Sequence, residues 1–229
     1  MPRGGSTRKR NSGRDMDESD DWWDVMFQLG MPVLYILGII TGIIGTICQG
    51  VITEYWSNLE PAVCFLYAKT ATSSVVYTFG SALAVCNWVT YGGVVAIIIA
   101  FISGLVYTIQ VRTHKDLTIS AACSVTGILV TFLLMLAVTC TMAEGMRITC
   151  TSMGLNSANN KGESCYEKLD KRALGEQLPV QTSTMVRSAM VAFIGSTVIF
   201  FIIACFHLSD FYRRTLRHRY DAVAYRDRA

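Results

Sequence analysis

Four long apolar runs alternate with polar segments along the chain. The runs cover residues 32–52, 88–110, 119–143 and 186–208, and Asp, Glu, Lys, Arg and His are absent from them except for Arg187 and His207 near the two ends of the last run. The first run, of 21 residues, would form a helix about 31 Å long at about 1.5 Å per residue, enough to cross the hydrocarbon core of a bilayer. The pattern therefore predicts an all-α membrane protein built as a bundle of four transmembrane helices.

The apolar runs divide the rest of the chain into two tails, one short loop and two long loops. The tails are residues 1–31 and 209–229, the short loop is 111–118, and the long loops are 53–87 and 144–185. Lys and Arg number five in the first tail, two in the short loop and six in the second tail. Because basic residues close to spans stay in the cytoplasm, we expect both termini to be cytoplasmic and both long loops to be outside, in a multi-pass protein of the plasma membrane.

Cysteines are distributed in agreement with this topology. The two long loops hold two each, and the tails and the short loop hold none; the loop cysteines are Cys64, Cys86, Cys150 and Cys165. Pairs of cysteines on the oxidising side of a membrane predict two disulfides that staple a small extracellular cap. Pairing within each loop and pairing between the loops both remain open, and four free thiols in a reducing compartment are the third alternative.

The cap is expected to contain a hairpin and a short helix. In the first long loop, VCFLYA (63–68) and SVVYTF (74–79) are rich in β-branched and aromatic residues and flank a short polar stretch, which is typical of a hairpin. In the second long loop, Ser164 and Glu167 form a capping box for a helix that would run to Leu174 and end at Gly175.

Small residues recur at every fourth position of the first run. Gly38, Gly42, Thr46 and Gly50 would leave one face of that helix almost bare, so that a second backbone can come close. Two interpretations follow for this face: internal packing against the other three helices, or a contact surface for a helix of another protein.

Polar chemistry is scarce at membrane depth. Gln49 and a few Ser and Thr are the candidates inside the runs, and the three histidines, His114, His207 and His218, lie at or beyond the ends expected to be cytoplasmic. Proton relays, ion pathways and intramembrane hydrolases need ionisable groups that face a cavity. The spacing of His, Cys and acidic residues is also not typical of a metal site. We therefore expect no catalysis, no cofactor and no metal.

Binding is the function that remains. The sequence favours an accessory subunit or scaffold that associates laterally with a larger channel or receptor, or with itself; the alternative is a small oligomeric pore or transporter. Nucleic-acid binding is not expected.

The remaining candidates are short local features. Cys123 and Cys205 lie near the cytoplasmic ends of their runs, where palmitoylation is possible, although cysteines in spans, such as Cys48 and Cys140, also serve simply as small packing residues. The acidic stretch around Trp22 and Trp23 is either an interfacial anchor or a docking site for a cytoplasmic partner.

The basic second tail carries two overlapping features. Tyr212, Leu216, Tyr220 and Val223 follow helical spacing, which predicts a helix on the anionic lipids of the inner leaflet. The residues Tyr220 to Val223, YDAV, also resemble a tyrosine-based sorting signal.

Four cysteine motifs resemble those of a known family. PAVC in the first long loop, AVCNW before the second run, RITC after the third and SCYEKLD before the fourth are similar to the orphan four-span family called transmembrane protein 179. The resemblance covers roughly residues 32–214 and implies a topology, since the family has no established activity. Claudins share the four-span plan, but the first loop lacks their Gly-Leu-Trp with paired cysteines, so similarity to them is architectural.

Overall fold

Four long helices form the protein in a computed structural model that describes residues 14–58, 62–68, 81–113, 118–152, 165–167, 169–170 and 181–226. Side chains are described within these ranges except at 14–29, 111–113, 118–121, 214 and 216–226. The helices are α1 (Arg14–Ser57), α2 (Leu83–Thr113), α3 (Thr118–Ser152) and α5 (Thr182–Arg226). In hydrocarbon the backbone has no water to bond, so a helix that satisfies its own N–H and C=O groups is the stable form of these apolar runs.

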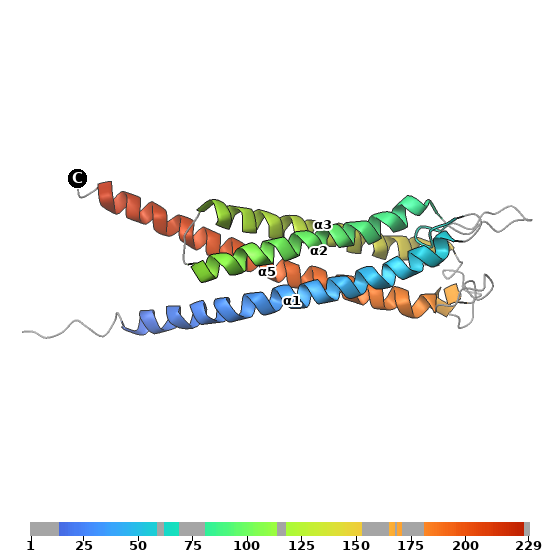
Figure 1. Ribbon diagram of the computed structural model, residues 1–229, viewed down its shortest axis with the longest axis horizontal. Coiled ribbons are helices and arrows are strands. Elements are labelled where there is room, and N and C mark those ends of the chain that lie inside the picture. The colour runs from blue at the N-terminus through green and yellow to red at the C-terminus, as the bar shows by residue number, and fades with distance from the viewer. Residues whose placement is uncertain are drawn as a thin grey trace, which may run out of the picture.

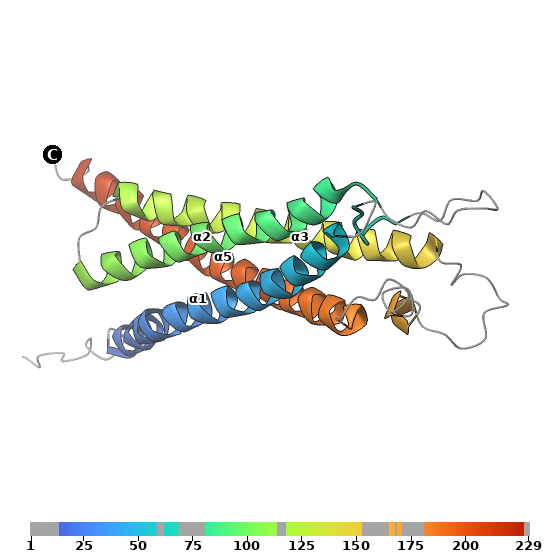
Figure 2. The same ribbon diagram turned by 45° about the vertical axis from the view of Figure 1, so that its right-hand side comes forward.

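The helices pack around a ring in which α1 lies beside α2 and α5, and α3 lies beside the same two helices. Figures 1 and 2 show that α1 begins and α5 ends at one end of the bundle, whereas α1 and α3 end, and α2 and α5 begin, at the other end. Each helix contains a candidate membrane span: Gly30–Ser57, Leu83–Gln110, Ala122–Ser152 and Thr182–Arg213. The predicted fold class, an all-α bundle of four spans, is confirmed.

Two helices extend well beyond the apolar runs that predicted them. The sequence offers Ser19 as the N-cap of a separate short helix in the acidic stretch, but this stretch forms the first turns of α1, and Pro32 lies inside α1 without ending it. A proline in a transmembrane helix removes one backbone hydrogen bond but is tolerated there. The basic second tail likewise continues α5 as helix to Arg226. The polar, basic composition of residues 1–14 predicts disorder there, and residues 1–13 lie outside the described part.

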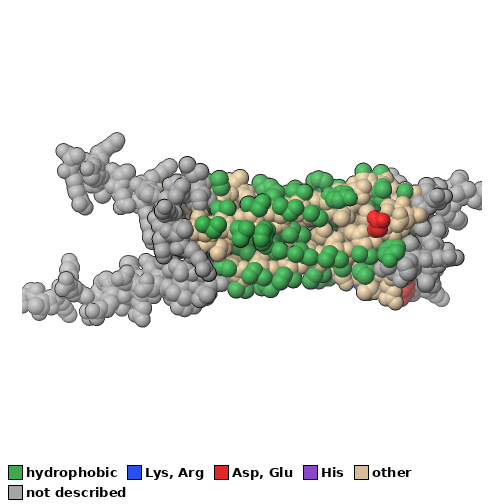
Figure 3. All heavy atoms as spheres, viewed as in Figure 1, with side chains coloured by type: hydrophobic (Ala, Val, Ile, Leu, Met, Phe, Trp, Pro, Cys, Tyr) green, Lys and Arg blue, Asp and Glu red, His purple; other side chains and the backbone are tan. Residues whose placement is uncertain are grey.

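Large apolar side chains cover the outside of the bundle, as a lipid-facing surface requires. On α1, for example, Ile36 and Ile47 are 57% and 60% exposed. Figure 3 shows hydrophobic side chains spread along the middle of the face it presents, and the acidic side chains coloured in it lie toward the end where α1 and α3 end. Since lipid is as apolar as these side chains, their exposure gives no drive for association, and the helices depend on close packing in the interior.

The bare face of α1 lies in that interior. A Cβ added at Gly38 would come within 3.1 Å of the Phe200 ring on α5, and one at Gly42 within 3.2 Å of both Ile97 on α2 and the Ser196 hydroxyl. Thr46 is buried on the same face, and Gly50 lies opposite Thr90 of α2. In the single chain, therefore, this face of α1 packs internally against α2 and α5.

We predict that Gly42→Leu prevents normal assembly of the bundle. A leucine at this position has no space between α2 and α5, so the variant should be retained inside the cell or degraded. Gly195→Leu is the matched control, because a Cβ at Gly195 meets nothing within 4 Å. Surface biotinylation of the two variants checks this. Normal surface delivery of Gly42→Leu would contradict the internal position of the α1 face.

Candidate functional site

Two disulfides hold the end of the bundle opposite the termini. Cys64 pairs with Cys86 at the start of α2, and Cys150 near the end of α3 pairs with Cys165. Pairing is therefore within each long loop, which was one of the two connectivities the sequence left open. Both bridges join a connection to the end of a membrane helix, so they restrict how the connections can move relative to the bundle.

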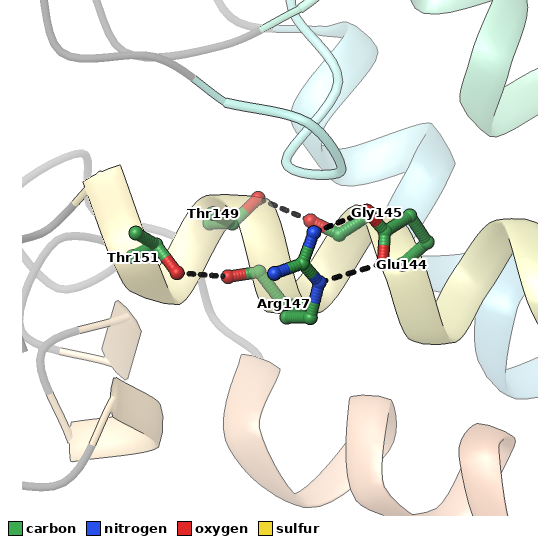
Figure 4. Close-up of polar contacts among 5 residues, drawn as sticks. All are labelled: Glu144, Gly145, Arg147, Thr149 and Thr151. Carbon is green, nitrogen blue, oxygen red and sulfur yellow. Dashed lines mark hydrogen bonds and ion pairs between the residues drawn. The ribbon is translucent and has the colours of Figure 1, made fainter.

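The connection after α1 is seated on α3 through Thr149. The buried Thr149 hydroxyl accepts a hydrogen bond from the Ala68 N–H at 3.1 Å and lies 2.9 Å from the carbonyl oxygens of Phe65 and Gly145, to which it donates. Nearby, the Tyr67 N–H donates to the Gly145 carbonyl. A Cβ added at Gly145 would lie 2.9 Å from the Tyr67 ring, so only a glycine allows this close approach. Figure 4 shows Thr149 on the side of α3 that faces this segment. One threonine thus satisfies backbone groups that would otherwise be buried without partners.

Segment 63–68 does not form the predicted strand. It makes a single antiparallel bridge, between Cys64 and Ser81, and Tyr67 adopts a positive φ of 56°. The backbone groups that a strand would pair with a neighbour are bonded here to α3, so this part of the hairpin prediction is wrong. The other proposed strand, 74–79, lies outside the described residues.

The second connection is tied to α3 and α5. Residues 165–167 and 169–170 are helical, in agreement with the expected short helix; the predicted cap at Ser164 and the end at Leu174 and Gly175 lie outside the described residues. The Asp170 carboxylate accepts a hydrogen bond from the Ser183 N–H at 2.8 Å, which caps the start of α5. The Arg187 guanidinium lies 4.2 Å from the centre of the Tyr166 ring. These contacts and the Cys150–Cys165 disulfide hold the second connection on the ends of α3 and α5.

A buried aromatic cluster joins three helices near the opposite end. The Tyr35 hydroxyl of α1 lies 2.9 Å from the His207 Nε2 of α5, and Tyr107 of α2 packs edge-on against the His207 ring at 5.0 Å between centroids. Tyr35 and His207 are only 3% and 6% exposed. The sequence placed His207 at a helix end but did not single out either tyrosine. The available sequence signal for this cluster was a histidine at the edge of an apolar run. Its hydrogen-bond partner, Tyr35, lies 172 positions away in the sequence.

Polar groups in the middle of the bundle are largely used within or between helices. Thr139 and Thr197 join α3 to α5 at 2.8 Å between hydroxyl oxygens, and the Ser196 hydroxyl donates to the Gly38 carbonyl at 2.9 Å. Gln49 is fully buried and its Nε2 lies 3.4 Å from the Thr53 hydroxyl, whereas its Oε1 has no hydrogen-bond partner in the described part of the chain.

The other predicted site residues are dispersed. The free cysteines Cys123, Cys140 and Cys205 are exposed on the outer surface, and Cys48 is half-buried. The backbone of Tyr220 and Val223 is helical within α5, and their side chains lie outside the described residues. Within the described ranges, no group of three or more His, Cys, Asp or Glu could hold a metal ion.

One charged pair lies on the outer surface of α3. Arg147 donates to both carboxylate oxygens of Glu144, at 2.7 Å from Nε and 2.6 Å from Nη2, and both side chains are exposed. Figure 4 shows the pair on one side of the helix, with Thr151 one turn beyond. The pattern of apolar runs does not predict this pair, which follows the third run.

The fold and its four candidate spans define a four-span helical membrane protein. No protein-family model, no curated protein and no solved structure matches the chain. The resemblance to the transmembrane protein 179 family therefore stays a prediction that depends on short cysteine motifs.

We predict that Thr149→Val loosens the cap. The change keeps the side-chain shape but leaves the buried Ala68 N–H without an acceptor, which should lower the free energy of unfolding by about 1–3 kcal/mol. Thr151→Val is the control, because the exposed Thr151 hydroxyl donates to the Arg147 carbonyl of its own helix and, within the described ranges, to no other element. Thermal unfolding of the purified variants in detergent measures the difference. Equal stability of the two variants would refute the role assigned to Thr149.

Proposed function

We propose that the protein is not an enzyme and acts by lateral binding in the plasma membrane, as an accessory subunit or scaffold of a larger channel or receptor complex. The observation that carries the proposal is the chemistry of the bundle interior. In the described ranges the buried polar side chains are Ser, Thr, Gln and His, and no Asp, Glu, Lys or Arg is buried. The buried titratable side chains in this part of the chain include His207 and Tyr35, which are hydrogen-bonded to each other. Transport and hydrolysis within a membrane usually depend on ionisable groups in a cavity.

Tight packing supports the same proposal. A Cβ at Gly93 of α2 would lie 2.9 Å from the Thr46 hydroxyl of α1, and one at Gly45 would lie 3.0 Å from the Phe193 ring. Toward the other end, a Cβ at Gly127 of α3 would overlap the Ser103 hydroxyl of α2. Side chains therefore fill the space between neighbouring helices at several depths. Contact with another molecule is thus proposed to occur at the lipid-facing surface and not in the interior of the bundle.

The proposed orientation has both termini in the cytoplasm. Both disulfides lie at the end of the bundle away from the termini, and disulfides persist in oxidising compartments. The basic second tail continues α5 as helix, which suits contact with anionic lipids of the inner leaflet.

An oligomeric pore is the second candidate, and one observation favours it. The Glu144–Arg147 pair places charge on the outside of the bundle, where an assembly of several copies could line a polar path between subunits. The reconstitution experiment below separates the two candidates.

We predict that epitope tags at residues 1 and 229 are stained only after cells are permeabilised. A tag that replaces part of segment 153–164 in the second long loop should be stained in intact cells and serves as the control. Surface staining of either terminal tag without permeabilisation would overturn the orientation.

We further predict that the purified protein alone, reconstituted in liposomes, conducts no ions and moves no solute. Mild-detergent purification of tagged protein, followed by mass spectrometry, should recover a larger membrane protein. A reproducible conductance that thiol reagents alter in the native chain but not in Cys140→Ser would contradict the accessory role and support the pore.

A further inference from the structure

Two helices reach equally far out of the bundle at the end where α1 begins and α5 ends. The Tyr35 hydroxyl lies 2.9 Å from the His207 Nε2, so these two residues lie at the same depth. From residue 35, α1 extends back 21 positions to Arg14, and from residue 207, α5 extends on 19 positions to Arg226. At about 1.5 Å per residue, both helices reach roughly 30 Å beyond this contact.

The other two helices stop much earlier at this end. Tyr107 of α2 stacks on Tyr35 at 6.2 Å between ring centroids. Six residues later α2 ends at Thr113, where the short connection to α3 follows. Figure 1 shows that α1 and α5 continue beyond both of them. We call residues 14–29 the α1 extension and residues 214–226 the α5 extension.

The α1 extension is acidic and has no base on its own helix with which to pair. Its six acidic residues are Asp15, Asp17, Glu18, Asp20, Asp21 and Asp24. After Arg14, the whole of α1 contains no Lys, Arg or His. Any base that pairs with these acids must therefore come from another element.

The α5 extension carries the opposite charge. From Arg213 to Arg226, α5 contains one acid, Asp221, and five arginines. The five are Arg213, Arg214, Arg217, Arg219 and Arg226. The arginines thus outnumber the acid beside them, and the two extensions are complementary in charge.

The bundle holds the two extensions of one chain apart. Each extension continues a helix that runs through the whole bundle, so its direction is set by its own span. Figures 1 and 2 show the start of α1 and the end of α5 separated from each other in both views. Salt screens opposite charges that are separated in water, so their attraction within one chain is weak.

A second copy supplies the complement to both extensions at once. Helices α1 and α5 are neighbours in the ring of four. When the faces formed by these two helices meet across a twofold axis along the membrane normal, α1 of each copy lies beside α5 of the other. The arrangement is self-complementary, because each copy offers one acidic and one basic helix.

The register of this antiparallel pair follows from the Tyr35–His207 contact, since a rotation about the membrane normal leaves depth unchanged. Asp24 lies 11 positions from Tyr35, and Arg217 and Arg219 lie 10 and 12 positions from His207. Acidic and basic residues therefore come level with each other between the copies. Asp21 and Asp221 are an exception, since each lies 14 positions from the contact.

Apolar residues at helical spacing favour contact between the extensions. They are Trp22, Met26 and Leu29 on α1, and Leu216, Tyr220 and Val223 on α5. Two such helices can pair in water through an apolar seam with opposite charges beside it. Anionic lipids attract the arginines near the membrane, but they offer no partner to the acids of α1.

We propose that the protein forms a symmetric homodimer in which the α1 extension of each copy pairs with the α5 extension of the other. The juxtaposition of two oppositely charged helices of equal reach at one end of the bundle carries this inference. It goes beyond the proposed lateral binding, since it does not require the channel or receptor partner.

A cysteine pair placed in the two extensions provides the first arm of the test. Ser19→Cys and Ala222→Cys are introduced into two full-length chains with different tags, at positions 16 and 15 residues from the Tyr35–His207 contact. The unpaired cysteines of both chains are changed to Ser: Cys48, Cys123, Cys140 and Cys205. Mild oxidation of membranes that contain both chains should give a disulfide-linked product with both tags.

The matched control replaces Ser19→Cys with Thr113→Cys at the end of α2. This position lies six residues from Tyr107, so it does not reach the depth of Ala222. Its yield should be about tenfold lower. A single chain that carries both Ser19→Cys and Ala222→Cys is compared with the two chains, because pairing within one chain would give a product with the mass of a monomer.

Charge exchange provides the second arm. One variant carries Asp17→Lys, Asp21→Lys and Asp24→Lys. The other carries Arg217→Glu, Arg219→Glu and Arg226→Glu, and keeps the two arginines next to the span. Each variant expressed alone should lower the cross-linking yield about tenfold, because like charges then meet between the copies.

Co-expression of the two charge variants should restore the yield, since each altered extension then meets its opposite on the other chain. Pairing within one chain cannot produce this restoration. Formation of the Cys150–Cys165 disulfide and surface delivery confirm that each variant has folded.

Three outcomes overturn the proposal. The first is a two-tag yield no higher than that of the Thr113→Cys control. The second is a link that forms only within one chain, and the third is a mixture of charge variants that behaves as each does alone. The proposed function stays separately testable, since a monomer that still recovers a larger membrane protein contradicts the dimer alone.

Discussion

Close approach of helix backbones is the constraint on which the rest of this structure depends. In lipid, burying apolar side chains gives no net drive, so the helices are held by packing and by hydrogen bonds between them. The glycine face of α1 meets both by admitting aromatic side chains of α5 at Gly38 and Gly45 and by exposing the Gly38 carbonyl to the Ser196 hydroxyl. Once α1 is held between α2 and α5, the ring of four helices follows.

The two ends of the bundle are closed by different chemistry. At the disulfide end, the connection after α1 is held by a covalent bridge, by the buried side chains of Phe65 and Leu66 and by the hydroxyl of Thr149. At the other end, the contact between Tyr35, Tyr107 and His207 joins α1, α2 and α5 without a bridge. The interior between these ends carries mostly hydroxyls that donate to their own helix, as at Thr46, Thr131 and Thr197. The hydrogen of each of these hydroxyls is thus satisfied within its own helix.

The sequence predicted the number of helices and the presence of disulfides in the two long loops. The first depends on composition, and the second on the side of the membrane where the cysteines lie. The sequence also identified Gly38 and Gly42 as part of a bare helix face suited to close packing, within the chain or with a partner, since spacing along one helix is visible in a single chain. It could not predict that Gly93 meets Thr46 or that Tyr35 meets His207, because these contacts depend on the register between helices. The strand proposed at 63–68 was wrong for a related reason. The backbone of this segment hydrogen-bonds to α3 and not to a neighbouring strand, and one of these bonds joins the Phe65 carbonyl to Thr149, 84 positions away. Disulfide pairing was open until the connections were placed on the helix ends.

The central claim is that the small-residue face of α1 packs against α2 of the same chain. Thr46→Cys with Gly93→Cys, in a chain whose unpaired cysteines are changed to Ser, tests it most directly, because a Cβ at Gly93 lies 2.9 Å from the Thr46 hydroxyl oxygen and a disulfide needs close Cβ atoms. Mild oxidation should link the two positions within one chain, leaving the mass that of a monomer and both thiols unavailable to alkylation. Free thiols at both positions, or a link found only between two chains, would contradict the account.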